Sequence, residues 1–203
     1  MSNNKEGKFN VDTCHLFIAV RRNKDNDDVV GKGKACIRRI IRDYNDDLKV
    51  IRRQCLSIGG VWRVYHTVNA RDMRKALKQF RHTIIDTDST DICSLWRSEL
   101  LQQSNRAEKK FMLDIDTKNW ELYMEILSWF KTYFDGECQK TKVEQDVEIS
   151  RYYSPNGYHV VLSKPFNRKL FCESFPDVTV LVDGYYFVEM VRGEEDENHI
   201  SYT

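Results

Sequence analysis

The stretch KKFMLDIDTKN, from Lys109 to Asn119, decides how the rest of the chain is interpreted. An apolar run ends in Asp114 and Asp116, and the segment that follows, NWELYMEILSWFKTYF, has apolar residues at helical spacing. This order predicts a strand that feeds a helix. Because alternate side chains of a strand point to opposite faces, Asp114 and Asp116 are expected to project from the same face.

These two acids allow two interpretations. Neighbouring carboxylates repel each other unless a cation lies between them, and hard oxygen ligands suit Mg²⁺ or Mn²⁺. Alternatively, the strand ends here and both acids are solvated. The same D-x-D spacing recurs at Asp25 and Asp86, so the letters alone do not decide between a metal site and a solvated edge.

The bulk composition predicts a folded soluble protein without an obvious partner. The 203 residues are 41% hydrophobic, enough for one substantial domain. A net charge of +1, from 32 basic and 31 acidic residues, neither predicts nor excludes nucleic-acid binding. Six widely spaced cysteines form no C-x-x-C pair, which argues against a zinc knuckle and favours reduced thiols. With no signal core and no long apolar run, we expect a cytoplasmic protein, or one in a host-cell compartment, without membrane insertion.

Periodicity predicts an α+β (α/β) fold with one central mixed or antiparallel sheet flanked by helices. We expect a flexible tail over 1–12, one domain over 13–193 and an acidic tail over 194–203. Within the domain, an N-terminal lobe would cover 13–105 and a catalytic core 106–193. The elements that matter below are a helix over 35–56, a strand over 59–69, a helix over 70–85, two strands around the turn 154–157 and a hairpin turning at 183–184.

A second motif, SPNGYHVVLSKPFN, places His159 at the start of a predicted strand. The glycine before it, Gly157, lets another group approach the backbone closely. Together with the turn amides, its polar side chains are donors of the kinds that hold a triphosphate. They are Ser154, Asn156, His159 and Lys164. Alternatively, His159 is an ordinary strand residue with a hydrogen-bonded imidazole.

A third motif, TVLVDGYYFVE, ends an apolar run at Asp183. This carboxylate would complete a three-acid metal site, or it begins an Asp-Gly turn, where aspartate is favoured for local reasons. Leu181 stands where the nucleotidyl-lysine motif K-x-D-G has its lysine, which excludes that covalent mechanism.

In this order the three motifs resemble those of the archaeo-eukaryotic primase superfamily, which includes primase-polymerases of viruses and plasmids. The resemblance extends from about Val61 to Glu189. It implies that Asp114, Asp116 and Asp183 bind Mg²⁺ or Mn²⁺ and that His159 contacts the phosphates of the incoming nucleotide. Gly157 stands where the family often has serine, and Asp177 and Glu189 compete with Asp183 for the third position.

The resemblance implies a template-dependent nucleotidyltransferase acting in replication or repair. Its partners would be nucleoside triphosphates, a nucleic-acid template and primer, and a helicase or another replication protein. Basic side chains around the predicted helix over 70–85 are candidates for the template backbone, or they form a solvated face. They are Arg63, Arg71, Arg74, Lys75, Lys78 and Arg81.

Two other functions fit the same residues. Three acids and a histidine around two metals also suit a nuclease, and Lys109, Lys110 and Lys118 lie near the acids in sequence to position water. The chain could instead keep the fold without the activity, as a nucleic-acid or nucleotide-binding module.

Overall fold

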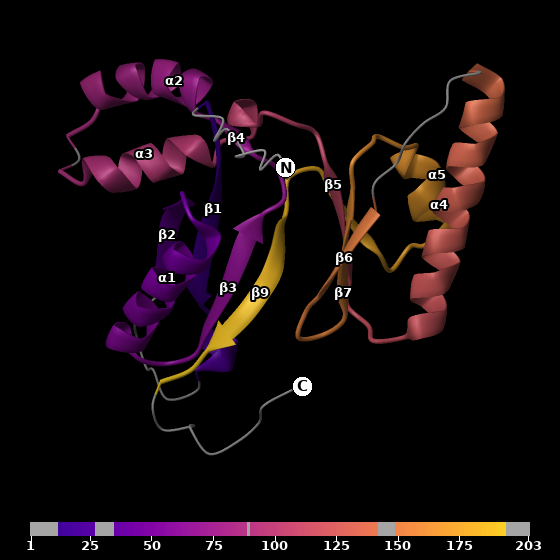
Figure 1. Ribbon diagram of the computed structural model, residues 1–203, viewed down its shortest axis with the longest axis horizontal. Coiled ribbons are helices and arrows are strands. Elements are labelled where there is room, and N and C mark those ends of the chain that lie inside the picture. The colour runs from indigo at the N-terminus through magenta and orange to yellow at the C-terminus, as the bar shows by residue number, and fades with distance from the viewer. Residues whose placement is uncertain (1–11, 27–34, 89, 142–148, 194–203) are drawn as a thin grey trace, which may run out of the picture.

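The structure, a computed structural model, describes residues 12–26, 35–88, 90–141 and 149–193. The predicted tails lie outside these residues, apart from Asp12. The chain is an α+β protein with two antiparallel sheets in place of the single predicted one (Figure 1). In chain order the elements are β1 (Thr13–Arg21), a 3-10 helix (Asn23–Asp25), β2 (Ala35–Ile41), α1 (Tyr44–Ile58), β3 (Trp62–Thr67), β4 (Arg71–Asp72), α2 (Met73–Ile85), α3 (Ile92–Leu100), a second 3-10 helix (Gln103–Asn105), β5 (Phe111–Ile115), α4 (Trp120–Thr141), β6 (Ile149–Tyr153), β7 (Tyr158–Leu162), α5 (Arg168–Ser174), β8 (Thr179–Leu181) and β9 (Tyr185–Val191).

The first sheet has the strand order β2-β1-β3-β9, and β4 adds a short pairing to β1. Side chains of β1 alternate between two packed clusters. Phe17 joins the cluster under α1 with Ile51 and Trp62, whereas Leu16 joins the cluster with Ala76 of α2 and Leu100 of α3. The sheet is therefore covered by helices on both faces.

The predicted helix over 35–56 is wrong in its first third. Residues 35–41 form β2, and the helix starts only at Tyr44. Ile37 packs with the cluster under α1 and Ile40 with the cluster under α2, which is the alternation of a strand. The side chain of Asp43 accepts a hydrogen bond from the Asp46 amide and begins α1 as its N-cap.

The second sheet has the strand order β6-β7-β5-β8, with all neighbours antiparallel. Helix α4 follows its first strand and α5 follows its third, which is the split βαβ arrangement. Both helices cover one face, where Leu113, Ile126, Phe130, Val160 and Phe171 are fully buried. Each such side chain contributes about 1.5–3 kcal/mol through burial.

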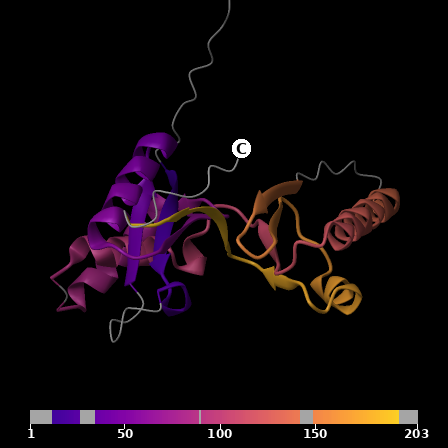
Figure 2. The same cartoon turned by 90° about the horizontal axis from the view of Figure 1, so that it is seen from below.

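The helix-free face of the second sheet meets one end of the first sheet. Met112 and Val161 of the second sheet pack with Val68 and with Tyr186 of β9. Viewed from below, the two sheets lie side by side with their helices outside, and β9 runs back from the second to the first (Figure 2).

The predicted hairpin at 183–184 does not form. β8 pairs with β5 in the second sheet, whereas β9 pairs with β3 in the first. Residues 182–184 therefore cross from one sheet to the other. β9, which lies within the segment predicted as the core over 106–193, thus pairs with a strand of the segment predicted as the N-terminal lobe over 13–105. No helix in the described ranges is long and apolar enough to span a bilayer.

Candidate functional site

Asp114 and His159 lie opposite each other on neighbouring strands. The β5–β7 register pairs these two residues directly. Their neighbours Leu113 and Val160 point toward α4 and α5, so Asp114 and His159 point to the helix-free face. His159 Nε2 is 3.3 Å from Asp114 Oδ1. The structure thus places one residue from each of the first two motifs side by side.

The hydrogen bonds of His159 define its tautomer. The Phe187 amide donates to Nδ1 at 3.0 Å, so Nδ1 carries a lone pair and the proton of the neutral ring is on Nε2. The His159 side chain is 7% exposed, against 33% for Asp114, and its Nε2 lies beside the Asp114 carboxylate. In this arrangement Nδ1 is engaged inside the protein by the Phe187 amide, and the nearly buried Nε2 is next to an acid.

Asp116 follows the end of β5 and is exposed. Across the sheet, Thr179 of β8 pairs with Asp114. Asp177, which is also exposed, precedes Thr179 by two residues and therefore belongs to the same end of the sheet. Among the three candidates for the third acid, Asp177 is the one at this end.

The polar groups of the turn between β6 and β7 bond to one another, and the turn packs closely against the end of β5. The Gly157 amide donates to Ser154 Oγ at 3.0 Å, and the Ser154 amide donates to the Gly157 carbonyl at 2.9 Å. A Cβ at Gly157 would lie 2.0 Å from the Ile115 carbonyl oxygen. The close approach predicted at this glycine is confirmed, and the approaching group is the chain's own backbone.

Of the other two predicted phosphate ligands, one is exposed in this turn and the other lies far from it. Asn156 is exposed in the turn. Lys164 follows the far end of β7, five residues after His159, which corresponds to roughly 16 Å along a strand. The structure therefore does not gather Ser154, Asn156, His159 and Lys164 around one phosphate position.

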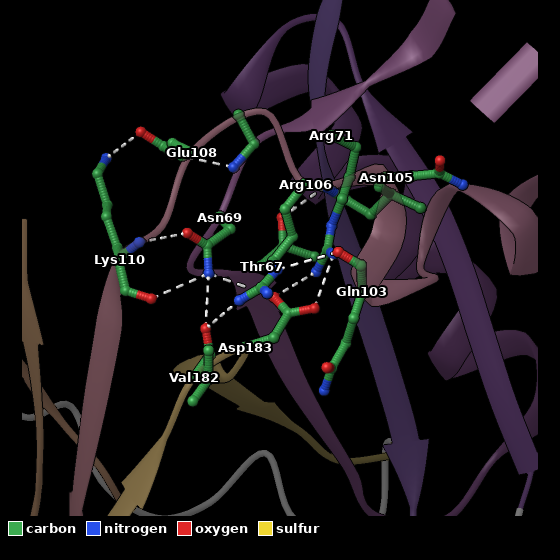
Figure 3. A network of polar contacts seen from close by, with 12 residues as sticks. Thr67, Asn69, Arg71, Gln103, Asn105, Arg106, Glu108, Lys110, Val182 and Asp183 are labelled. Carbon is green, nitrogen blue, oxygen red and sulfur yellow. Dashed lines mark hydrogen bonds and ion pairs between the residues drawn. The ribbon is translucent and has the colours of Figure 1, made fainter. Parts of the chain in front are cut away.

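Asp183 belongs to a different cluster, at the point where the chain crosses between the sheets (Figure 3). Arg71 donates to both of its carboxylate oxygens, at 2.8 and 2.9 Å. The pair is buried, with Arg71 0% and Asp183 4% exposed. A carboxylate paired in this way balances the buried guanidinium, so its two oxygens are engaged inside the protein.

Asn69 joins three chain segments at the same crossing. Its side-chain amide donates to the carbonyls of Lys110 and Val182, and its oxygen accepts from the Lys110 amide at 2.6 Å. Arg106 donates to the Val182 carbonyl at 2.7 Å. The cluster thus ties the end of the first sheet to the segments that enter β5 and leave β8 (Figure 3).

The predicted basic surface is smaller than expected. Arg71 is buried with Asp183, and Arg63 is paired with Asp25 at 2.6 Å in a largely buried contact. On α2, Arg74 is exposed and pairs with Asp12. The remaining exposed basic side chains of this helix are Lys75, Lys78 and Arg81.

The sequence did not indicate a cavity of about 210 Å³ between the two sheets. His15, His66 and Tyr186 line it from the first sheet, and Tyr152 lines it from the second. The four rings form a stack in which His15–His66, His66–Tyr186 and Tyr186–Tyr152 centroids are 4.7, 4.8 and 3.8 Å apart. Spacing in the sequence could not reveal it, because the four side chains come from four strands.

The comparisons add no relative to this geometry: no family model, no curated protein and no solved structure matches the chain. Within the part of the chain that the structure describes, no three His, Cys, Asp or Glu side chains are grouped so as to hold a metal ion.

Proposed function

We propose that the protein is a primase-polymerase-like nucleotidyltransferase that joins nucleotides on a nucleic-acid template in replication or repair. The observation that carries this proposal is the Asp114 carboxylate, one-third exposed on the helix-free face and 3.3 Å from His159 Nε2, with the exposed Asp116 two residues further on. The alternative of a purely solvated strand end does not account for a nearly buried histidine directed at one of the two acids.

The acids present fit one Mg²⁺ or Mn²⁺. Magnesium is commonly held by one or two carboxylates, with water and substrate phosphates as the remaining ligands. Asp114 and Asp116 would hold the ion, which when bound supplies positive charge at the reacting phosphate. Asp177 precedes the strand residue that pairs with Asp114, and we propose it as the third acid in place of Asp183, which Arg71 occupies.

His159 acts in this proposal as a positioning residue. The Phe187 amide fixes the ring through Nδ1, and the fixed ring places Nε2 3.3 Å from Asp114 Oδ1, where it limits the positions open to that carboxylate. Residues that orient metal ligands typically change metal affinity 10–100-fold when they are mutated. We therefore expect His159→Ala to raise the Mn²⁺ concentration needed for half-maximal activity by 10–100-fold, with a smaller change in the nucleotide KM.

The exposed face of α2 is the proposed contact for the template backbone. Lys75, Lys78 and Arg81 have their side chains in solvent, and phosphate contacts need only positive charge. Each contact removed should lower the slope of log affinity against log salt by about 0.7–0.9. A triple substitution of these residues by glutamine, compared with wild type across a salt series, measures that change.

The experiment that tests the activity uses a labelled primer annealed to a longer template, with nucleotides and Mn²⁺ or Mg²⁺. Extension by wild type and its loss by more than 100-fold in Asp114→Asn and in Asp116→Asn is the expected result. A matched control is Asp86→Asn with Asp88→Asn, which alters another exposed D-x-D and should leave extension unchanged. Shortening of the primer instead would identify a nuclease.

A non-catalytic nucleic-acid or nucleotide-binding module is the second candidate. It is favoured by the internal engagement of His159 and Asp183, two residues that the sequence motifs assign to substrate and metal. This candidate predicts strand binding that depends on α2 and is insensitive to Asp114→Asn. Binding of neither Mn²⁺ nor nucleotide, with strand binding retained, would remove both enzymes and leave a module that binds nucleic acid only.

A further inference from the structure

Strand β2 forms an open edge of the first sheet. It pairs only with β1 among the described residues, and it lies at the edge of that sheet that faces away from the second sheet (Figure 1). In an antiparallel edge strand, the backbone N–H and C=O groups of every second residue point outward without a strand to receive them. β2 has 7 residues, so this edge is roughly 23 Å long.

A groove of about 760 Å³ lies along this edge. Residues 36–40 of β2 all line it, and because consecutive side chains point to opposite faces of a strand, a space that contacts all of them lies beside the strand edge. Asp47 of α1 lines one side, and Ile92 and Trp96 of α3 line the other. Since α1 and α3 cover opposite faces of the sheet, the groove is an open strand edge between two helical walls.

The arginines of β2 are held against these walls. Arg39 donates to Asp47 of α1 at 2.6 Å, and Arg38 donates to Ser98 of α3 at 2.8 Å. Charged side chains on an edge strand commonly block its pairing with another chain. Here both guanidinium groups are bonded to helices on opposite faces, so they are directed to the walls of the groove and leave the outer edge of β2 accessible.

The groove carries an excess of positive charge. Four arginines and two aspartates line it: Arg38, Arg39, Arg42, Arg97, Asp47 and Asp91. Asp47 is bonded to Arg39, and Asp91 is the N-cap of α3. Arg42 and Arg97 have no acidic partner among the described residues. The groove is therefore complementary to an occupant that carries carboxylates or phosphates.

The strand edge distinguishes between occupants. It presents N–H donors and C=O acceptors together, which an extended peptide backbone matches, whereas the phosphates of a nucleic acid only accept hydrogen bonds. A second copy of this chain is disfavoured by charge. In an antiparallel pairing of two β2 strands centred on these arginines, Arg38 would lie opposite the partner's Arg38 or the partner's Arg39, and like charges directly opposite destabilise a strand pair.

We propose that the open edge of β2 binds an acidic segment of a partner protein as an added β-strand, with carboxylates of that segment at Arg42 and Arg97. Alternate side chains of the added strand would face the α3 wall, where Ile92 and Trp96 provide apolar contacts. This partner site is on the first sheet, apart from Asp114 on the second, and goes beyond the proposed activity.

The probe is a blocked heptapeptide that alternates glutamate and valine, and its matched control has lysine in place of glutamate. Calorimetric titration of the full chain should show the acidic peptide binding about tenfold or more tightly than the control. N-methylation of alternate amides along one edge of the peptide should weaken binding about tenfold, whereas methylation along the other edge should have little effect, because only one edge pairs with β2. Equal effects of both methylations, or no binding up to about 1 mM, would overturn the proposal.

Exposed cysteines report whether the peptide occupies the groove. Cys36 of β2 and Cys93 of α3 line it, whereas Cys172 lies on α5 beside the second sheet. Saturating acidic peptide should slow alkylation of Cys36 and Cys93 by iodoacetamide and leave that of Cys172 unchanged, with the sites resolved by mass spectrometry. Protection of neither groove cysteine would place the peptide elsewhere and contradict the assignment.

Two groove variants test the charge and the wall. Ile92→Asp adds a negative charge at the first turn of α3, where aspartate is compatible with the helix, and should weaken binding of the acidic peptide about tenfold. Leu170→Asp is the matched control, because Ile92 and Leu170 are 44% and 45% exposed and Leu170 lies on α5. Arg42→Gln combined with Arg97→Gln should also weaken binding about tenfold. Unchanged affinity in both groove variants, with folding verified by circular dichroism, would overturn the proposal.

Three further measurements identify other occupants. Displacement of the peptide by oligo-dT, with protection of the same cysteines, would make the groove a nucleic-acid site. Self-association in analytical ultracentrifugation that the acidic peptide abolishes would assign the edge to a second copy. Tighter peptide binding after deletion of residues 194–203, which begin with the acidic run EEDE, would assign it to this chain's own segment. Each of these results would overturn the proposed partner, and we expect none of them.

Discussion

Asp114 and Asp183 both end an apolar run, and the sequence predicts the same role for both. The structure gives them different partners. Asp183 accepts two hydrogen bonds from a fully buried guanidinium, whereas Asp114 Oδ1 lies 3.3 Å from an imidazole nitrogen and its side chain remains one-third exposed. The same local pattern therefore produces an internal ion pair in one place and an accessible acid in the other. The partner, which comes from a distant part of the chain, decides the outcome.

The strongest test of this difference is removal of one member of the buried pair. Arg71→Met leaves Asp183 buried without its counter-charge and should lower the free energy of unfolding by about 3–5 kcal/mol. Urea denaturation followed by circular dichroism measures the change. Arg74→Met is the control, because the Arg74–Asp12 pair is exposed and should contribute less than about 1 kcal/mol.

The double variant Arg71→Met, Asp183→Leu sharpens this first prediction. Replacing both partners removes the uncompensated charge, so the double variant should be more stable than Arg71→Met alone. If the double variant loses as much stability as the single one, the pair contributes through shape or through the Asn69 contacts and not through charge compensation.

A smaller effect on the free energy of unfolding is expected from His66, which lies in β3 of the first sheet. Its pKa is lowered to about 4, mainly by burial and then by His15, while the bond to Thr67 opposes this shift and Lys110 adds to it. Tyr44 and Tyr186 face the same ring. Between pH 6.5 and 4 the unfolded state binds a proton that the folded state does not. The free energy of unfolding should therefore fall by about 3 kcal/mol as pH is lowered through this window.

His66→Phe retains a stacked ring and removes the titration. Urea unfolding at pH 7.0, 5.5 and 4.5 should show a flatter pH dependence for this variant than for wild type. His82→Phe is the matched control at an exposed position and should follow wild type. Parallel curves for wild type and His66→Phe would show that other groups cause the acid sensitivity.

Gly157→Ala tests how closely the β6–β7 turn packs against the end of β5, next to Asp114 and Asp116. An added Cβ would meet the Ile115 carbonyl oxygen at 2.0 Å, so β5 and the turn must separate. Gly157→Ala should lower the free energy of unfolding by about 1–3 kcal/mol and weaken metal-dependent activity by shifting Asp116. Gly136→Ala, in α4 with nothing within 4 Å of the added Cβ, should be neutral or stabilising by up to about 1 kcal/mol. Equal loss in both variants would contradict the close-approach argument.

Periodicity predicted the α+β class, the strand at 59–69, the helix after β4 and the turn at 154–157, because these depend on local side-chain alternation. It failed where tertiary pairing decided the structure. Residues 35–41 carry isoleucines that fit a helix as well as a strand, and pairing with β1 selects the strand. The Asp-Gly sequence at 183–184 fits a hairpin, but β8 and β9 pair with strands of different sheets.

The candidate site could likewise be predicted only where local side-chain alternation decides the arrangement. Asp114 and His159 were found because both lie on strands whose alternation assigns each side chain to a face. Arg71 was predicted as a surface residue from its basic neighbours, since nothing in its segment indicates an aspartate 112 positions later. The imidazole pair of His15 and His66 has no signal in the sequence, because its defining contact is a single carbonyl oxygen between two strands.

Asp114→Ala should have the smallest effect on stability and thereby completes the comparison. It removes one contact of 3.3 Å and leaves His159 Nε2 at a position that water reaches, because Asp114 is one-third exposed. A partly exposed contact of this kind contributes about 1 kcal/mol or less, so the loss should be small. Urea denaturation of Asp114→Ala beside Arg71→Met measures both aspartate environments in one assay. A loss above about 3 kcal/mol for Asp114→Ala would show that Asp114 has the structural role of Asp183, and the proposed metal site would lose the observation that supports it.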